Sequence, residues 1–207
     1  MQFETVLPQE IEKRSFEIIT EELGDVQLDP VQAPIIKRVI HTTADFEYLD
    51  TLCFSENAVQ RLQEALRDGA CIVTDTQMAK AGISKRTLEK YGGKVYCFMG
   101  DEDVAQSAAK NGTTRAAASM DKAAGLSQNI VFAVGNAPTA LIRLHELMEQ
   151  GKITPKGIIG VPVGFVNVVQ AKELILQCNV PCIVARGRKG GSNVAAAICN
   201  ALLYTME

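Results

Sequence analysis

Ile130-Val131-Phe132-Ala133-Val134-Gly135-Asn136-Ala137-Pro138 is the stretch of sequence that decides the fold. Its first five residues are apolar without alternation, which is typical of a parallel strand buried on both faces. A helix is predicted to begin at Pro138, because proline suits the first turn of a helix, and to stop at Gly151. The stretch therefore indicates a strand, a short loop and a helix, which is the repeating unit of parallel sheets.

Four further apolar runs have the same character. They are predicted to form strands at Cys71–Thr74, Val95–Met99, Ile158–Val163 and Cys182–Ala185. Helices are predicted after Ser55 as an N-cap, from Pro138, from near Asn167 and from near Ser192. Because strand–helix–strand connections are right-handed, we expect a Rossmann-like α/β fold with an open, mainly parallel sheet of about five strands and flanking helices.

The residues before Cys71 are expected to form a helical N-terminal region, with an apolar stripe at Phe16, Ile19 and Leu23. The chain of 207 residues is long for one hydrophobic core and short for two, so a single domain over residues 1–207 is expected. A net charge of -3 provides no general attraction to nucleic acid or to an anionic membrane, so neither is expected as a partner. Any anion site must be built locally.

Six cysteines are present, but none forms a C-x-x-C pair and no histidine lies near Cys178 and Cys182. Reduced thiols in a cytoplasmic protein are therefore expected, and a metal site is not. The segment Met1–Glu12 lacks the apolar core of a signal peptide, and no apolar run reaches the roughly 18 residues of a membrane helix.

Ligands of parallel sheets bind beyond the carboxyl ends of the strands. The loop Arg186–Ser192 places three cations and two glycines at such a position, just before a predicted helix. Glycines allow close backbone approach, and the N–H groups of a helix start favour an anion. An ordinary basic surface turn is an equally good interpretation of this loop alone. Neither standard nucleotide-binding glycine signature is present.

The two histidines and Arg115 each have a structural and a functional interpretation. His145 adjoins the apolar stripe of the helix starting at Pro138, which favours a structural role. His41 follows an apolar run and precedes Thr42 and Thr43, where a structural role is also more common. Histidine is nevertheless the residue type that exchanges protons near neutral pH. Arg115 follows a predicted turn near a helix start, where an exposed arginine is the more frequent interpretation.

Seven segments in order resemble the precorrin-8X methylmutase (cobalt-precorrin-8 methylmutase) family of cobalamin biosynthesis, from about residue 10 to residue 203. The segments are Arg14-Ser15-Phe16, Arg38-Val39-Ile40-His41, Asp75–Met78 with Gly82, Asn111–Arg115, Gly135–Leu141, Gly160–Val166 and Arg186–Ser192. No single segment is specific, but the combination is highly specific.

This resemblance implies an isomerase that moves a methyl group from carbon 11 to carbon 12 of precorrin-8X or cobalt-precorrin-8, giving hydrogenobyrinate or cobyrinate. It implies a Rossmann-like homodimer that needs no dissociable cofactor. The family's proposed catalytic acid corresponds to His41, which would protonate a ring nitrogen. A corrinoid polycarboxylate requires an apolar floor and cationic or N–H groups at its rim.

The resemblance also implies a set of substrate-binding residues. They are Ser15, Arg38, Asp75, Arg115, Asn136, Arg186, Arg188 and Lys189. One departure is Gln170-Ala171-Lys172, where the family often has Glu-Ser-Lys, so no site role is transferred to the first two positions. A non-catalytic corrinoid carrier would share the same pocket, and a nucleotide-dependent enzyme would rest on fold analogy alone.

Overall fold

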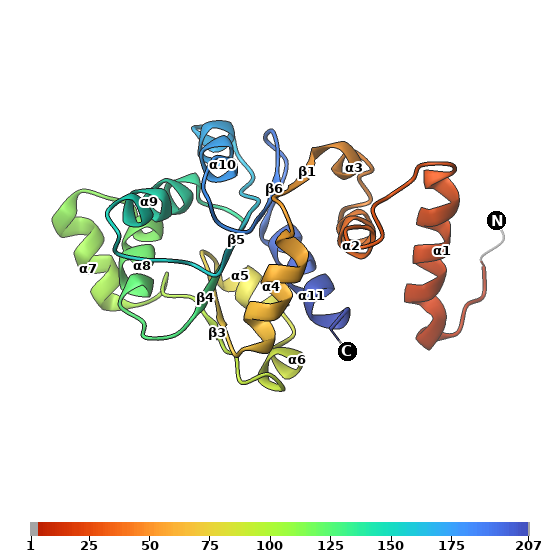
Figure 1. Ribbon diagram of the computed structural model, residues 1–207, viewed down its shortest axis with the longest axis horizontal. Coiled ribbons are helices and arrows are strands. Elements are labelled where there is room, and N and C mark those ends of the chain that lie inside the picture. The colour runs from red at the N-terminus through yellow and green to blue at the C-terminus, as the bar shows by residue number, and fades with distance from the viewer. Residues whose placement is uncertain (1–3, 207) are drawn as a thin grey trace.

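The computed structural model describes residues 4–206 and places one mixed sheet between two layers of helices (Figure 1). Residues 1–3 and 207 lie outside the described residues. The first three belong to the segment in which no signal peptide is expected. The sheet has six strands in the order β1-β6-β5-β4-β2-β3. They are β1 (Leu52–Phe54), β2 (Cys71–Thr74), β3 (Val95–Tyr96), β4 (Ile130–Val134), β5 (Gly157–Gly160) and β6 (Cys182–Ala185).

The predicted α/β class and its mainly parallel sheet are confirmed, since β2 to β6 pair in parallel. The sequence did not predict β1, which pairs antiparallel with β6 and sets Cys53 opposite Val184. A three-residue strand is too short to show a periodic sequence pattern, so β1 is recognisable only from its pairing with β6. Two predicted strands end early, β3 at Tyr96 and β5 at Gly160; Pro162 follows β5 and has no N–H to donate to a neighbouring strand.

The helices form two layers. One face of the sheet is covered by α8 (Arg115–Ala124), α9 (Pro138–Glu149) and α10 (Val168–Leu176), with α7 (Glu102–Asn111) packed on α8. The other face is covered by α2 (Ala33–Thr43), α4 (Ala58–Arg67), α5 (Gln77–Gly82), α6 (Lys85–Glu89) and α11 (Ser192–Tyr204). Three shorter or peripheral elements complete the chain, η1 (Pro8–Glu10), α1 (Ile11–Leu23) and α3 (Tyr48–Thr51).

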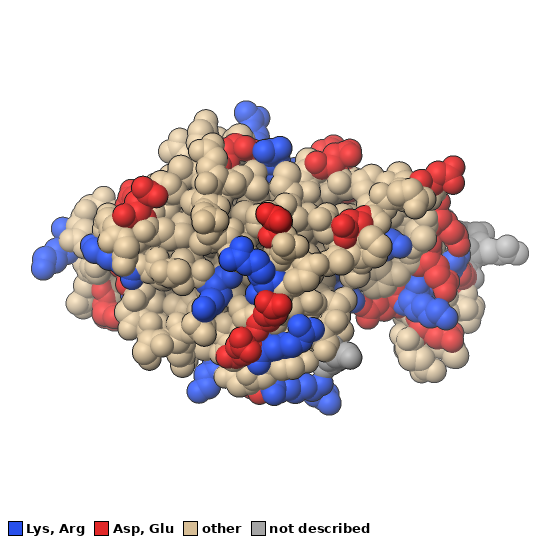
Figure 2. All heavy atoms as spheres, in the orientation of Figure 1, with Lys and Arg blue, Asp and Glu red and all other residues tan. Residues whose placement is uncertain are grey.

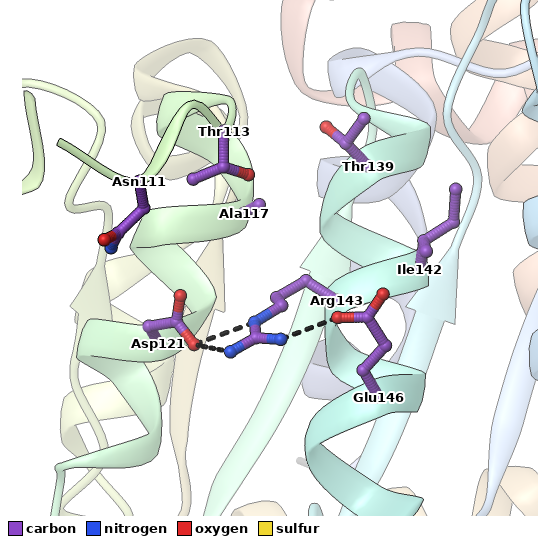
Figure 3. Close-up of a pocket in the computed structure, with 8 residues that line it drawn as sticks. All are labelled: Asn111, Thr113, Ala117, Asp121, Thr139, Ile142, Arg143 and Glu146. Carbon is purple, nitrogen blue, oxygen red and sulfur yellow. Dashed lines mark hydrogen bonds and ion pairs between the residues drawn. The ribbon is translucent and has the colours of Figure 1, made fainter. Parts of the chain in front are cut away.

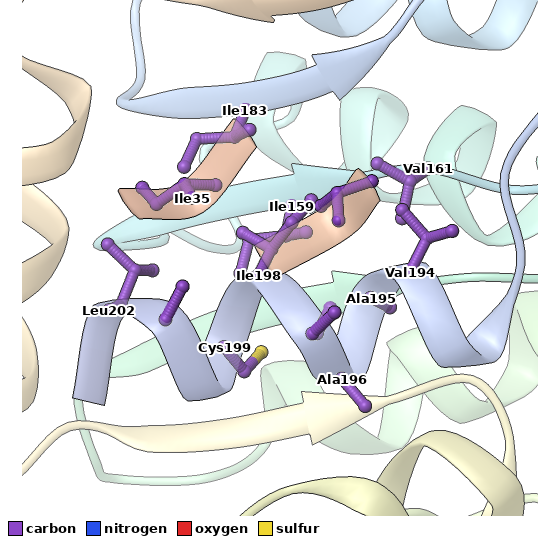
Figure 4. Packing of buried hydrophobic residues seen from close by; sticks show 14 of the residues in the cluster. Ile35, Ile159, Val161, Ile183, Val194, Ala195, Ala196, Ile198, Cys199 and Leu202 are labelled. Carbon is purple, nitrogen blue, oxygen red and sulfur yellow. The ribbon is translucent and has the colours of Figure 1, made fainter. Parts of the chain in front are cut away.

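The core on the second face is built around α11, in which nine of the thirteen residues are buried. Ile198 and Leu202 of this helix pack with Ile159 and Ile183 of the central strands (Figure 4). Full burial of such an aliphatic side chain stabilises the fold by about 1.5–3 kcal/mol. Because α11 is apolar on nearly all sides, it also packs against α2, and this contact holds the N-terminal region against the sheet.

The N-terminal region is helical, as predicted. Helix α1 stands at one end of the molecule and packs on α2 (Figure 1). Ile19 and Leu23 of the predicted stripe are buried, whereas Phe16 is half-buried. The predicted cap at Ser55 is wrong: α4 begins at Ala58, and the Ser55 hydroxyl accepts a hydrogen bond from the N–H of Cys182 at 2.8 Å. No helix within residues 4–206 is long and apolar enough to cross a membrane.

Candidate active site

The direction in which the chain adds strands to the sheet reverses at β2, and the carboxyl ends of β2 and β4 lie at this switch point. From β2 the chain first adds β3 on one side and then returns to place β4 on the other side. Ligands of open α/β sheets bind in the crevice at such a switch point. Asp75 follows β2 at this crevice, and the Gly135–Ala137 loop follows β4.

The carboxylate of Asp75 holds the Gly135–Ala137 loop in place at the crevice. Its Oδ1 accepts a hydrogen bond from the N–H of Gly135 at 2.8 Å, and its Oδ2 accepts from Asn136 at 2.8 Å and Ala137 at 2.6 Å. Burial raises the pKa of Asp75, while the three N–H groups act in the opposite direction. The side chain is fully buried, so the expected contact of Asp75 with the ligand does not fit this geometry. The Asn136 side chain remains exposed.

The loops after β5 and β6 are joined by backbone hydrogen bonds. Gly164 N–H donates to the carbonyl of Arg188 at 3.1 Å, and Gly191 N–H donates to that of Val161 at 2.9 Å. A Cβ atom at Gly190 would overlap the carbonyl oxygen of Val161. The glycines of the cationic loop, residues 186–191, therefore permit close contact between two loops, in addition to any approach to a ligand.

The four candidate cations at this edge fall into two classes. Arg186 pairs with Glu173 at 3.1 Å, and Lys189 pairs with Asp45 at 2.6 Å and with Glu47 at 2.8 Å. Arg115 and Arg188 are exposed and form no ion pair with any carboxylate within residues 4–206. These two arginines are therefore the cations most readily available to an external anion.

Charge on the face shown in Figure 2 does not gather into a separate basic patch. On the face shown in Figure 2, basic and acidic side chains are interspersed rather than gathered by sign. The Asp45 hydrogen bond is the main cause that raises the pKa of Lys189, and the same bond lowers the pKa of Asp45. Part of the positive charge of the cationic loop is therefore already neutralised by carboxylates of the same chain.

His41 lies on the last turn of α2 and is exposed. Its ring stacks on Phe16 of α1, with 5.3 Å between ring centroids and 21° between the planes. Arg38, one turn earlier, holds its guanidinium 4.9 Å from the Phe16 ring and hydrogen-bonds Glu12. Ser15 lies next to Phe16 and donates to the Ile11 carbonyl at 3.0 Å. The packing of α1 on α2 therefore brings two expected site residues, Arg38 and His41, onto Phe16, while Ser15 precedes Phe16 on α1.

An ion pair links this helical cluster to the cationic loop. Helix α2 ends at Thr43, and Ala44 caps it in the left-handed conformation with φ 53°. Asp45, immediately after this turn, contacts Lys189. The end of the His41 helix is consequently tied to the loop after β6 within a single chain.

Sequence reasoning missed a set of exposed apolar side chains at the same edge. Phe165 and Val166 are 82% and 78% exposed in the loop after β5, and Met78 is 71% exposed at the start of α5. The Arg188 guanidinium lies 5.5 Å from the centre of the Phe165 ring. Neighbouring exposed apolar side chains, such as Phe165 and Val166, are characteristic of ligand or partner contact. Large apolar residues in loops expected to be polar were the signal that could have identified them.

A groove between α8 and α9 borders this edge and has a volume of about 370 Å³ (Figure 3). It adjoins the hydrogen bond between the hydroxyls of Thr114 and Thr139, 2.9 Å apart. Arg143 lies on the groove and bridges Asp121 at 2.7 Å and Glu146 at 2.6 Å. The charged side chains of this groove are therefore already paired with one another. No cluster of three or more potential metal-binding side chains occurs within residues 4–206.

Comparison with known proteins gives one consistent result. The family model described as precorrin-8X methylmutase matches residues 10–205. The chain is 48% identical to the cobalt-precorrin-8 methylmutase of Salmonella typhimurium, covering 97% of this chain and 96% of the relative. It is 35% identical to the precorrin-8X methylmutase of Pseudomonas aeruginosa, covering 96% of each. The crystal structure of precorrin-8X methyl mutase from Thermus thermophilus superimposes with a TM-score of 0.85 at 38% identity, covering 94% of this chain and 96% of that one.

Proposed function

The chain belongs to the precorrin-8X methylmutase family and is an isomerase of cobalamin biosynthesis, and on this premise we propose that His41 is its general acid. The proposed substrate is precorrin-8X or cobalt-precorrin-8, whose methyl group moves from carbon 11 to carbon 12. The whole chain is proposed to act as one corrinoid-binding domain, because a single sheet carries all the strand-end loops of the site.

The reaction needs no external nucleophile, because one carbon–methyl bond breaks and another forms within the same ring system. A proton donated by His41 to a ring nitrogen draws electron density away from the migrating centre. The substrate and product are isomers, so the ring system must lose one proton again before release, and His41 or water accepts it. General acid catalysis of this kind contributes about a hundred- to ten-thousand-fold. Holding the ring in its reactive conformation supplies further acceleration.

The observation that carries the proposal for His41 is its exposed position on α2, where it and Arg38 both contact the Phe16 ring. Phe16 stacks on its ring, which restricts the orientation of the imidazole while leaving it accessible. His145, by comparison, is half-buried on α9 in a groove with Cys178, away from the strand-end loops. Only His41 therefore combines exposure with neighbours suited to an anionic substrate.

The remaining contacts follow from the chemistry of the corrinoid. Its acetate and propionate groups are proposed to meet Arg115 and Arg188, because these cations lack carboxylate partners within residues 4–206. Arginine can hold a carboxylate through two parallel hydrogen bonds. Its apolar macrocycle is proposed to lie on Phe165, Val166 and Met78, whose burial by a ligand would be favourable.

The test compares His41→Ala with His145→Ala as the matched control. His41→Ala is expected to lower kcat at least a hundredfold while retaining binding of the corrinoid product, and His145→Ala is expected to retain the native rate. Turnover of excess substrate would separate an enzyme from a corrinoid carrier, which would show binding spectra without new product. Native turnover by His41→Ala would refute the proposed acid.

Assembly and location are part of the same proposal. We infer a homodimer in the cytoplasm, as expected for the family. Sedimentation of the purified chain would test the dimer, and fractionation of the producing cells would test the location. Parallel assays with the metal-free and the cobalt-containing substrate would identify which of the two is turned over faster.

A further inference from the structure

Lys172 on α10 is a fully buried lysine that the proposed chemistry does not use. Its Nζ donates hydrogen bonds to the carbonyl of Gly187 at 2.9 Å and to that of Lys189 at 2.7 Å. No carboxylate within residues 4–206 forms an ion pair with it. A buried ammonium group is costly unless hydrogen bonds satisfy it, so these two carbonyl groups account for its presence.

The two contacts belong to a continuous pattern along the cationic loop. The carbonyls of residues 187 and 189 point to Lys172, while the carbonyl between them, that of Arg188, accepts from the N–H of Gly164. Three successive carbonyl groups are thus held from two sides. A backbone constrained in this way fixes the direction in which the Arg188 side chain leaves the loop, and its contact with Phe165 orients the guanidinium.

The neighbouring cations are held separately by carboxylates, Arg186 by Glu173 and Lys189 by Asp45. Arg188 has no such partner within residues 4–206 and lies over Phe165. From this arrangement we propose that Lys172 is a positioning residue, which clasps the loop backbone so that Arg188 faces a carboxylate of the substrate. The inference rests on the proposed function, because it assumes that the cationic loop meets the corrinoid.

A positioning role predicts a loss of substrate affinity without a comparable loss of chemistry. Lys172→Met keeps the length of the side chain and removes both hydrogen bonds. It is expected to raise KM about tenfold and to leave kcat within about twofold, since the chemistry assigned to His41 is untouched. Lys152→Met, at an exposed lysine on the turn after α9, is the matched control and is expected to leave both constants unchanged.

Lys172→Arg is the second variant, because a guanidinium retains N–H donors for the same carbonyls. It is expected to recover part of the lost affinity, and it carries the test if the methionine variant fails to fold. A native KM in Lys172→Met, or equal KM values in folded methionine and arginine variants, would overturn the inference. A parallel fall in kcat and thermal stability with an unchanged KM would also overturn it, since that result marks a purely structural residue.

Arg188→Ala separates this inference from the proposed function. The substitution is expected to raise KM by at least as much as Lys172→Met, and the double variant is expected to lose little more than Arg188→Ala alone. If Arg188→Ala leaves KM unchanged, the proposed carboxylate contact fails. If Arg188→Ala raises KM but the two substitutions act additively, the contact stands and the positioning role of Lys172 fails.

Discussion

Replacement of Asp75 tests whether one buried carboxylate holds the ligand crevice together. Asp75→Ala removes the acceptor of three backbone N–H groups, of which that of Gly135 is buried and those of Asn136 and Ala137 are partly buried. An unsatisfied buried donor costs about 1–3 kcal/mol. We take about 2 kcal/mol for the first group and about 1 kcal/mol for each of the others. The expected loss of unfolding free energy is therefore about 4 kcal/mol.

Asp75→Asn is expected to cost about half as much. An amide oxygen in the place of Oδ2 keeps the bonds from Asn136 and Ala137, while the NH2 group faces the N–H of Gly135. Of the three backbone N–H groups, only that of Gly135 is then left without an acceptor, at about 2 kcal/mol. For a domain of this size, a loss of about 1 kcal/mol lowers Tm by about 2–4 °C. Asp75→Asn should therefore melt roughly 4–8 °C below the native protein, and Asp75→Ala roughly 8–16 °C below it.

The assay is urea unfolding followed by circular dichroism, with thermal melts in parallel. Asp68→Asn, at an exposed aspartate beyond the end of α4, is the control and is expected to change stability by less than about 0.5 kcal/mol. The cost of burying the carboxylate, which raises the pKa of Asp75, is removed in both variants, so the prediction requires the unsatisfied N–H groups to outweigh that gain. An Asp75→Asn variant at least as stable as the native protein would refute it, as would equal losses in the two variants.

Three further outcomes are expected. Gly190→Ala should lower the unfolding free energy by about 2–3 kcal/mol in urea titrations, because its Cβ meets the backbone of Val161; native stability would contradict the observed packing. Burial lowers the pKa of Lys172 from 10.5 to about 8, so the native protein should gain stability relative to Lys172→Met as the pH rises from 8 to 10.5. Between pH 8 and 10.5 the unfolded chain still holds the proton that the folded chain has lost, so the gain in unfolding free energy approaches about 3 kcal/mol. A difference in unfolding free energy between the two proteins that does not change with pH would contradict the lowered pKa of Lys172. Phe165→Ala should leave Tm unchanged because the ring is 82% exposed, yet raise KM about tenfold in steady-state assays; a native KM would exclude Phe165 from the ring contact.

Much of the fold could be predicted because its signals are local. The strands at 71–74, 130–134 and 182–185 have the predicted bounds, since continuous apolar runs between turn residues are read directly from neighbouring positions. Strand β1 and the start of α4 could not be predicted. Leu52–Phe54 becomes a strand only by pairing with β6, and the Ser55 hydroxyl turns from its own helix to the N–H of Cys182, which is distant in sequence.

The candidate site divides in the same way. The motif loops, the two histidines and the cations were all identifiable from the sequence, and the family they resemble is the family to which the chain belongs. Residue identity could not distinguish Arg188 from Arg186 and Lys189, because ion pairing depends on Glu173 and Asp45 being brought alongside. Nor could it show that the Asp75 carboxylate is already occupied by backbone N–H groups.

The sequence by itself determined the mainly parallel sheet, the cationic loop at the end of its last strand and the histidine that we propose as the general acid. The tertiary structure alone decided which of these groups remain available. A hydrogen bond or an ion pair is settled by distance and burial, and both arise only when α1, α2 and α10 pack around the sheet. Asp75 and Lys172 are therefore bound to backbone groups, while Arg115, Arg188 and His41 face outward.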